Sequence, residues 1–196
     1  KPVLGVVYLP AKRELYFGTS AIGARHVGGP GLHEVRDAIA ARPRAAVEAA
    51  LDRSVRLPLG KPEDGRAMKI VQSSSHASRE ESEFFSALQA RGWEIEVASA
   101  GSSLKFCRVA DGSADLYPRF GPTMEWDTAA GQCIAEEGGA EVVTVEQGLP
   151  PGYNKVSLRN GPFLVLGPRF RAGLWEREAV LHSAAALDSR RRTPIR

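Results

Sequence analysis

The 196-residue sequence has few cysteines, no long apolar run and almost no excess of charge. Its two cysteines, Cys107 and Cys133, form neither a CxxC pair nor a zinc-finger spacing, so we expect no disulfide framework and no zinc site. No stretch approaches the roughly 18 apolar residues of a membrane span, and no secretory signal is visible. We therefore predict a cytoplasmic protein without a transmembrane segment, and leave open a peripheral association with the inner membrane.

The charge balance excludes another class of partner. Lysine and arginine total 26 against 23 acidic residues, a net charge of +3, which makes no case for nucleic-acid binding. The run at residues 190–192 is typical of a solvated basic tail. Apolar residues make up 43% and charged residues 25%, as in folded globular proteins, and no internal repeat is visible.

The first residue is Lys1 and the apolar pattern starts at once, so we expect the chain to belong to a longer protein. Residues 3–9 and 14–18 predict an antiparallel strand pair. The glycines and proline of residues 23–31 predict a loop, and residues 33–50 have helical composition interrupted by Pro43. We assign residues 1–66 to the remainder of an N-terminal α+β domain.

Residues 67–196 predict a C-terminal α/β domain, because strand and helix patterns alternate. Ser78 and Glu81 form a capping-box signature at one helix start. The expected strands are residues 68–72, 93–98, 140–145 and 163–167, with another beginning at 115–117. The expected helices begin at Ser78 and span residues 102–110, 126–137 and 175–187.

Two predicted helix starts carry groups that suit phosphate ligands. Asp127 lies in the first turn of a helix of small residues, where the amides favour an anion and the carboxylate could hold a divalent cation. A plain capping aspartate is the alternative. Ser102, Ser103 and Lys105 place two hydroxyls and an ammonium together at the other helix start. Taken alone, those residues favour a capped helix with an exposed lysine.

Two further groups follow predicted strands, where α/β proteins present ligand-binding residues. The run Ser73 to His76 offers hydroxyls and an imidazole, although a polar loop is an equal interpretation. Arg119 lies in a proline-containing turn and suits bidentate phosphate binding, but could equally be a surface arginine.

The motifs and their order along the chain resemble the inositol monophosphatase superfamily. The resemblance is carried by residues 101–107 and 114–131, which include the GSSLK and WDTAAG runs. Within the superfamily, Lys105, the PRFGPTME run and the Ser-x-Ser-His run resemble the bacterial 3'(2'),5'-bisphosphate nucleotidases of sulfur metabolism. The resemblance implies a layered α/β/α/β/α sandwich that here lacks its N-terminal part. It also implies a magnesium-dependent phosphatase that converts adenosine 3',5'-bisphosphate to AMP and phosphate.

By the same resemblance, Asp127 is the catalytic residue and a Mg²⁺ ligand. His76, Ser102, Ser103, Lys105, Arg119 and Asp127 contact the small-molecule nucleotide. The family's other metal motifs, an upstream glutamate and Asp-Pro-Ile-Asp-Gly-Thr, do not occur here, so we expect this chain alone to be inactive. The pairs Glu80–Glu81 and Glu136–Glu137 are interpreted as solvated helix faces.

The missing N-terminal layer predicts uncovered apolar surface on the first sheet and leaves open a homo-oligomer. Two other functions also remain open. One is an inositol-phosphate or sugar-phosphate phosphatase, and the other is a non-catalytic nucleotide-binding module.

Overall fold

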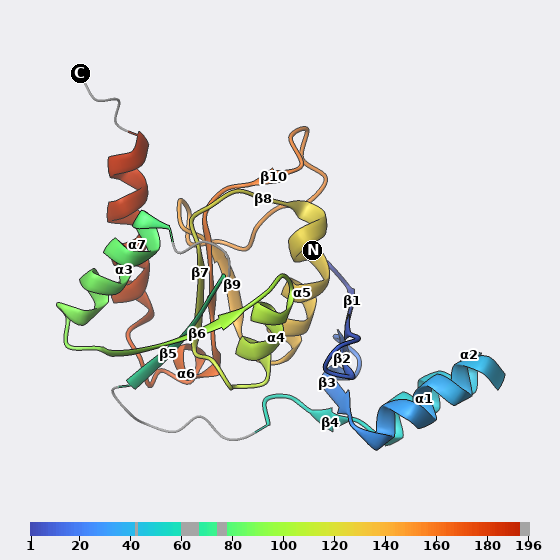
Figure 1. The fold of residues 1–196 in the computed structure, drawn as a ribbon. Helices are drawn as coiled ribbons and strands as arrows, with labels where there is room; N and C mark the ends of the chain where they lie inside the picture. The colour runs from blue at the N-terminus through green and yellow to red at the C-terminus, as the bar shows by residue number, and fades with distance from the viewer. Residues whose placement is uncertain (42, 60–66, 74–77, 193–196) are drawn as a thin grey trace.

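The computed structural model describes residues 1–41, 43–59, 67–73 and 78–192 (Figure 1). Its first sheet is antiparallel, in the order β1-β2-β3-β4. The predicted pair is confirmed, with Leu4 opposite Thr19 and Leu9 opposite Glu14. The strands are β1 Leu4–Leu9, β2 Glu14–Thr19, β3 Gly23–Gly28 and β4 Val55–Arg56.

The loop predicted over residues 23–31 is wrong for its first part, which forms β3. Ala24 and Val27 are buried in the sheet, and β3 pairs with β2 along its whole length. Positive φ angles occur only at its ends, at Gly23 (69°) and Gly29 (58°). Glycine therefore serves the turns on either side of the strand, while the strand itself is extended.

Two helices, α1 Pro30–Ala41 and α2 Pro43–Asp52, follow β3 and form a hairpin that projects from the rest of the molecule (Figure 1). The predicted interruption at Pro43 is confirmed, because α2 begins at that residue. Proline fits the first position of a helix, where no backbone N–H is needed for an intrahelical bond.

The second sheet is mixed, in the order β6-β5-β7-β11-β9. β5 is parallel to β6 and β7, whereas β11 is antiparallel to β7 and β9. Its strands are β5 Ala67–Ser73, β6 Glu94–Ala100, β7 Leu116–Arg119, β9 Glu141–Thr144 and β11 Phe163–Leu166. A small separate sheet pairs β8 Thr123–Met124 with β10 Arg159–Asn160.

The helices of this part lie on both faces of the second sheet (Figure 1). They are α3 Arg79–Gln89, α4 Leu104–Ala110, α5 Glu125–Glu137, α6 Pro168–Arg171 and α7 Arg177–Arg192. α4 and α5 lie between the two sheets, and α3 and α7 cover the opposite face of the second sheet. The layers therefore run β/α/β/α, in agreement with the α/β class expected.

Alternating strand residues feed two cores. Val71 and Tyr117 point toward α4 and α5, whereas Ile70 and Leu116 point toward α3 and α7. α5 approaches α4 so closely that a Cβ at Gly131 would lie 2.6 Å from the Phe106 ring. This contact explains why position 131 of α5 is a glycine.

The first core joins residues from both sides of the predicted boundary at residues 66 and 67, including Tyr16 and Ala24 as well as Val71 and Phe106. The division into two domains stays a prediction. On the other face of β1, Leu4, Val6 and Tyr8 are 60%, 53% and 53% exposed. The first sheet thus has an apolar outer face.

The two acidic pairs were expected on solvated helix faces, and this interpretation is wrong for Glu81 and Glu136. Glu81 is only 2% exposed, because it completes the predicted capping box: its N–H donates to the Ser78 hydroxyl and its carboxylate accepts from the Ser78 N–H. Glu136 is also largely covered and pairs with Lys1 at 3.0 Å. Packing, which the sequence pattern did not indicate, turns these carboxylates inward.

Candidate functional site

The parallel strands β5, β6 and β7 end at one edge of the second sheet. Ser73 lies opposite Ala100, and Ile70 lies opposite Leu116, so β7 ends beside them at Arg119. The helices α3, α4 and α5 follow these three strand ends. Open α/β sheets bind ligands at this edge, because the loops there converge. The predicted site residues 102–105, 119 and 127 all lie at or shortly after the ends of β6 and β7.

Lys105 is the most buried of these cations, at 4% exposure. Its ammonium donates to the Ala100 carbonyl at 3.3 Å and lies 5.1 Å from the centroid of the Tyr117 ring. Burial, reinforced by the charge of Arg119, lowers the pKa of Lys105 to about 8, and the Glu81 carboxylate opposes that shift. The alternative of a lysine exposed on a capped helix is therefore wrong.

Arg119 is half-buried at the end of β7. Its Nη2 donates to the Pro122 carbonyl at 3.2 Å, while its buried Nε has no hydrogen-bond partner among the described residues. Burial raises the pKa of the Glu81 carboxyl, and Arg119 and Lys105 offset part of that rise. Two cations and one buried carboxylate thus share this edge.

Ser102 and Ser103 precede α4, which begins at Leu104 and is shorter at its start than predicted. Ser102 is exposed and has a positive φ of 46°, and Ser103 occupies the N-cap position without a side-chain capping bond. The left-handed turn at Ser102 explains why the helix cannot include it.

Asp127 is exposed in the first turn of α5. Its Oδ2 accepts a hydrogen bond from the Met124 N–H at 2.8 Å, so it does cap the helix, although from inside the first turn. Burial raises the pKa of the Tyr117 hydroxyl, and the charges of Glu81 and Asp127 raise it further while Arg119 opposes them. The charge of Asp127 therefore influences Tyr117, which lies on β7 two residues before Arg119.

Ser73, the first residue of the predicted run Ser73 to His76, is the last residue of β5. His76 lies outside the described residues, together with Ser74 and Ser75, and its predicted role stays untested.

One face of α5 buries polar side chains that no motif in the sequence had indicated. Glu125, Thr128 and Gln132 are 7%, 3% and 1% exposed and bond to the segment that contains Tyr153, Lys155 and Asn160. The hydrogen bond from Lys155 is the main cause that lowers the pKa of Glu125. Polar residues at helical spacing, i, i+3 and i+7, are the signal that could have revealed this face.

The described residues do not complete a magnesium site. No group of three His, Cys, Asp or Glu side chains able to hold a metal occurs among them. Mg²⁺ requires octahedral oxygen coordination, and Asp127 supplies one carboxylate at this edge. Asp127 therefore fits as a single donor, without the rest of a donor set.

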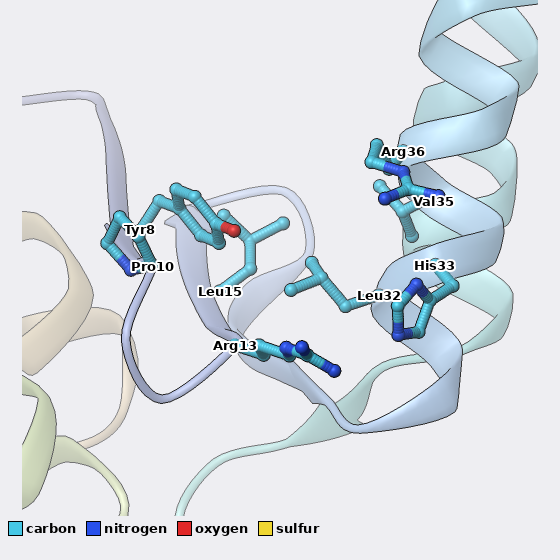
Figure 2. Close-up of a pocket in the computed structure, with 8 residues that line it drawn as sticks. All are labelled: Tyr8, Pro10, Arg13, Leu15, Leu32, His33, Val35 and Arg36. Carbon is cyan, nitrogen blue, oxygen red and sulfur yellow. The ribbon is translucent and has the colours of Figure 1, made fainter.

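Several cavities lie in the described part of the chain, including one near α5 and one near the first sheet. One of about 220 Å³ lies beside α5 and is lined in part by Thr128, Lys155 and Asn160. Another, of about 530 Å³, lies between the β1–β2 hairpin and α1 (Figure 2). Its lining is mainly apolar, from Tyr8, Pro10, Leu15, Leu32 and Val35, with Arg13, His33 and Arg36. Of the predicted site residues that the structure describes, none lines either of these cavities.

The fold and the site define a layered α/β protein that gathers ammonium, guanidinium and hydroxyl groups at the carboxyl edge of a mixed sheet. The chain belongs to the inositol monophosphatase family, whose model matches residues 1–186. Enzymes of this family are generally metal-dependent. Among the helices that the structure describes, none has the length and apolar character to cross a membrane.

Two relatives are similar over much of the chain. The 3'(2'),5'-bisphosphate nucleotidase CysQ of Salmonella typhimurium is 41% identical over 142 residues, which are 72% of this chain and 46% of that protein. The crystal structure of CysQ from Bacteroides thetaiotaomicron has a TM-score of 0.70 at 38% identity, over 86% of this chain and 59% of that one.

A more distant neighbour, staphylococcal IMPase-II, has a TM-score of 0.62 at 18% identity and shares the fold. It is matched over 96% of this chain and 60% of its own. The chain thus spans about half the length of the curated relatives it matches.

Proposed function

We propose that the protein is a phosphatase that removes the 3'-phosphate of adenosine 3',5'-bisphosphate. The observation that carries this proposal is the pair of cations Lys105 and Arg119 at one sheet edge. A buried ammonium and a guanidinium with an unpartnered Nε are costly unless an anion approaches them. The similarity to CysQ nucleotidases over 72% of the chain supports the choice of substrate.

Each predicted residue then has a role in binding. Lys105 and Arg119 attract the two phosphates, and Arg119 can donate in a bidentate manner. Ser102 and Ser103 directly precede α4, which carries Lys105, and in this proposal their hydroxyls and His76 complete the nucleotide contacts. Asp127 faces the same edge as the proposed catalytic residue and Mg²⁺ ligand.

The metal we propose is Mg²⁺, which would polarise phosphoryl oxygens and activate water when bound. Asp127 is the single donor that these residues contribute. The chain's own groups therefore support binding and orientation of the nucleotide, and we propose that these 196 residues alone do not hydrolyse it. A cytoplasmic location and peripheral association with the inner membrane both stay predictions.

Calorimetry on the 196-residue chain tests this proposal. We expect adenosine 3',5'-bisphosphate to bind at least tenfold more tightly than AMP, and Lys105→Met to remove most of that difference. Lys12→Met, which changes an exposed lysine away from the site, serves as the matched control. Equal affinity for the two nucleotides, or equal binding by wild type and Lys105→Met, would contradict the proposal.

Phosphate release with Mg²⁺ present separates the two other functions. Binding of the bisphosphate with neither turnover nor magnesium dependence, in any form of the protein, would favour a non-catalytic binding module. The missing metal donors among the described residues are the observation behind that alternative. Faster release from inositol 1-phosphate than from the bisphosphate would favour an inositol-phosphate phosphatase, as the family's name suggests.

A further inference from the structure

One face of α5 buries polar side chains. Glu125, Thr128 and Gln132 are all buried, and their spacing places them on one side of the helix. Tyr153 donates its hydroxyl hydrogen to Gln132 Oε1 at 2.7 Å and lies 3.2 Å from the Thr128 hydroxyl. The segment of residues 152–160 is therefore held against the first two turns of α5.

Glu125 receives three donors from this segment. Its carboxylate accepts from the backbone N–H groups of Asn154 at 2.8 Å and Lys155 at 3.1 Å, and from the Lys155 ammonium at 2.5 Å. Asn154 has a φ of 60°, a left-handed conformation that turns the backbone toward the carboxylate. A carboxylate with three donors is a strong anchor for the segment.

The Lys155 ammonium also donates to the Asn160 Oδ1 at 3.2 Å. Because that oxygen faces Lys155, the Asn160 amide nitrogen faces the other way. It donates to the Met124 carbonyl at 3.0 Å, the Thr128 hydroxyl at 3.1 Å and the Thr123 hydroxyl at 3.2 Å. Lys155 thus sets which end of the Asn160 amide meets the turn before α5.

That turn holds the candidate catalytic carboxylate. The Met124 carbonyl accepts from Asn160, and the Met124 N–H donates to Asp127 Oδ2 at 2.8 Å. The backbone supports the same arrangement, since β10 pairs with β8 and the Glu125 N–H donates to the Leu158 carbonyl at 2.9 Å. A continuous hydrogen-bonded path therefore runs from Lys155 through Asn160 and Met124 to Asp127.

We propose that Lys155 and Asn160 are positioning residues for Asp127: through Met124 they hold its carboxylate with Oδ2 bound to the N–H at the helix start. The importance of that orientation rests on the proposed function, in which Asp127 faces the phosphate. The orientation itself can be tested whether or not the chain binds a nucleotide.

The test is the Met124 amide in nitrogen-15 NMR spectra of the whole 196-residue chain. Asp127→Asn marks the position of that signal when the charged acceptor is lost. We expect Lys155→Met and Asn160→Asp to move the Met124 signal toward that position and to speed its hydrogen exchange at least tenfold. Lys155→Arg, which restores a cation, and Lys12→Met, an exposed control, should leave both values unchanged.

A merely structural role would loosen distant amides as well. We therefore expect the Leu164 amide, in the buried strand β11, to keep its wild-type exchange rate in Lys155→Met. A wild-type Met124 signal and exchange rate in both Lys155→Met and Asn160→Asp would overturn the proposal. So would equal acceleration at Met124 and Leu164 in Lys155→Met.

Nucleotide binding is measured separately, on the wild-type chain. Failure of the wild type to bind adenosine 3',5'-bisphosphate would contradict the proposed function. The NMR comparison would still decide whether Lys155 and Asn160 position Asp127, so the two failures are distinguishable.

Discussion

The ammonium of Lys105 lies 5.1 Å from the centroid of the Tyr117 ring and donates to the Ala100 carbonyl. Tyr117 and Arg119 are two residues apart on β7 and so point to the same side of the sheet. The aromatic face and one carbonyl are modest partners for a buried charge. An anionic ligand near Lys105 would therefore stabilise its buried positive charge.

We predict that the affinity for adenosine 3',5'-bisphosphate falls as pH rises through about 8, the lowered pKa of Lys105. Below that pH the ammonium is charged and attracts phosphate; above it the neutral amine does not. The dissociation constant should rise about tenfold between pH 7 and 9, measured by calorimetry. In Lys105→Met the dependence should vanish, and its persistence there would assign it to another group.

We predict that Lys105→Met stabilises the chain at pH 7. The folded pKa of about 8 is below the ordinary 10.5, so keeping Lys105 protonated costs the folded state free energy. Replacing it by an apolar side chain of similar length should raise the free energy of unfolding by about 1–3 kcal/mol. Urea unfolding measures the gain, which should shrink toward pH 10. A loss of stability at pH 7 would contradict this account.

We predict that Asp127→Ala removes most activity from any form of the protein that hydrolyses the bisphosphate. An activity within tenfold of wild type would exclude the catalytic role. The same change removes the hydrogen bond from the Met124 N–H, so it should also cost about 1 kcal/mol of stability. Comparing the thermal midpoint with that of Asp127→Asn separates the capping effect from the charge.

We predict that Gly131→Ala destabilises the chain, although alanine normally favours a helix by about 1 kcal/mol over glycine. Its Cβ would lie 2.6 Å from the Phe106 ring, so α4 and α5 must separate. The net cost should be about 1–3 kcal/mol by denaturant unfolding. Gly161→Ala is the matched control, because its Cβ meets no atom within 4 Å, and it should have little effect.

We predict that the 196-residue chain self-associates at micromolar concentration through the outer face of β1. Leu4, Val6 and Tyr8 are exposed there, and β1 is an edge strand without an internal charge. Light scattering after gel filtration should show dimers or larger species, and a Val6→Lys, Tyr8→Lys variant should reduce them. Val156→Lys, at a still more exposed valine elsewhere in the chain, is the control. A monomeric wild type would refute the prediction.

Local signals in the sequence predicted most elements correctly, because each depends on neighbours along the chain. The capping box of Ser78 and Glu81, the helix break at Pro43 and the β1–β2 pair are of this kind. The loop expected at residues 23–31 is wrong over residues 23–28, since pairing with β2 outweighed the local preference of glycine.

The sequence by itself determined the family, through the GSSLK and WDTAAG runs, and the residues proposed for the site. Only the tertiary structure decided whether each of these residues is buried and which partners it contacts. Burial of Lys105 and Glu81 depends on helices and strands that converge from distant positions, and no local pattern records it. The link from Lys155 and Asn160 to Asp127 likewise joins residues about thirty positions apart through side-chain and backbone hydrogen bonds, which exist only once α5 and the later segment have packed together.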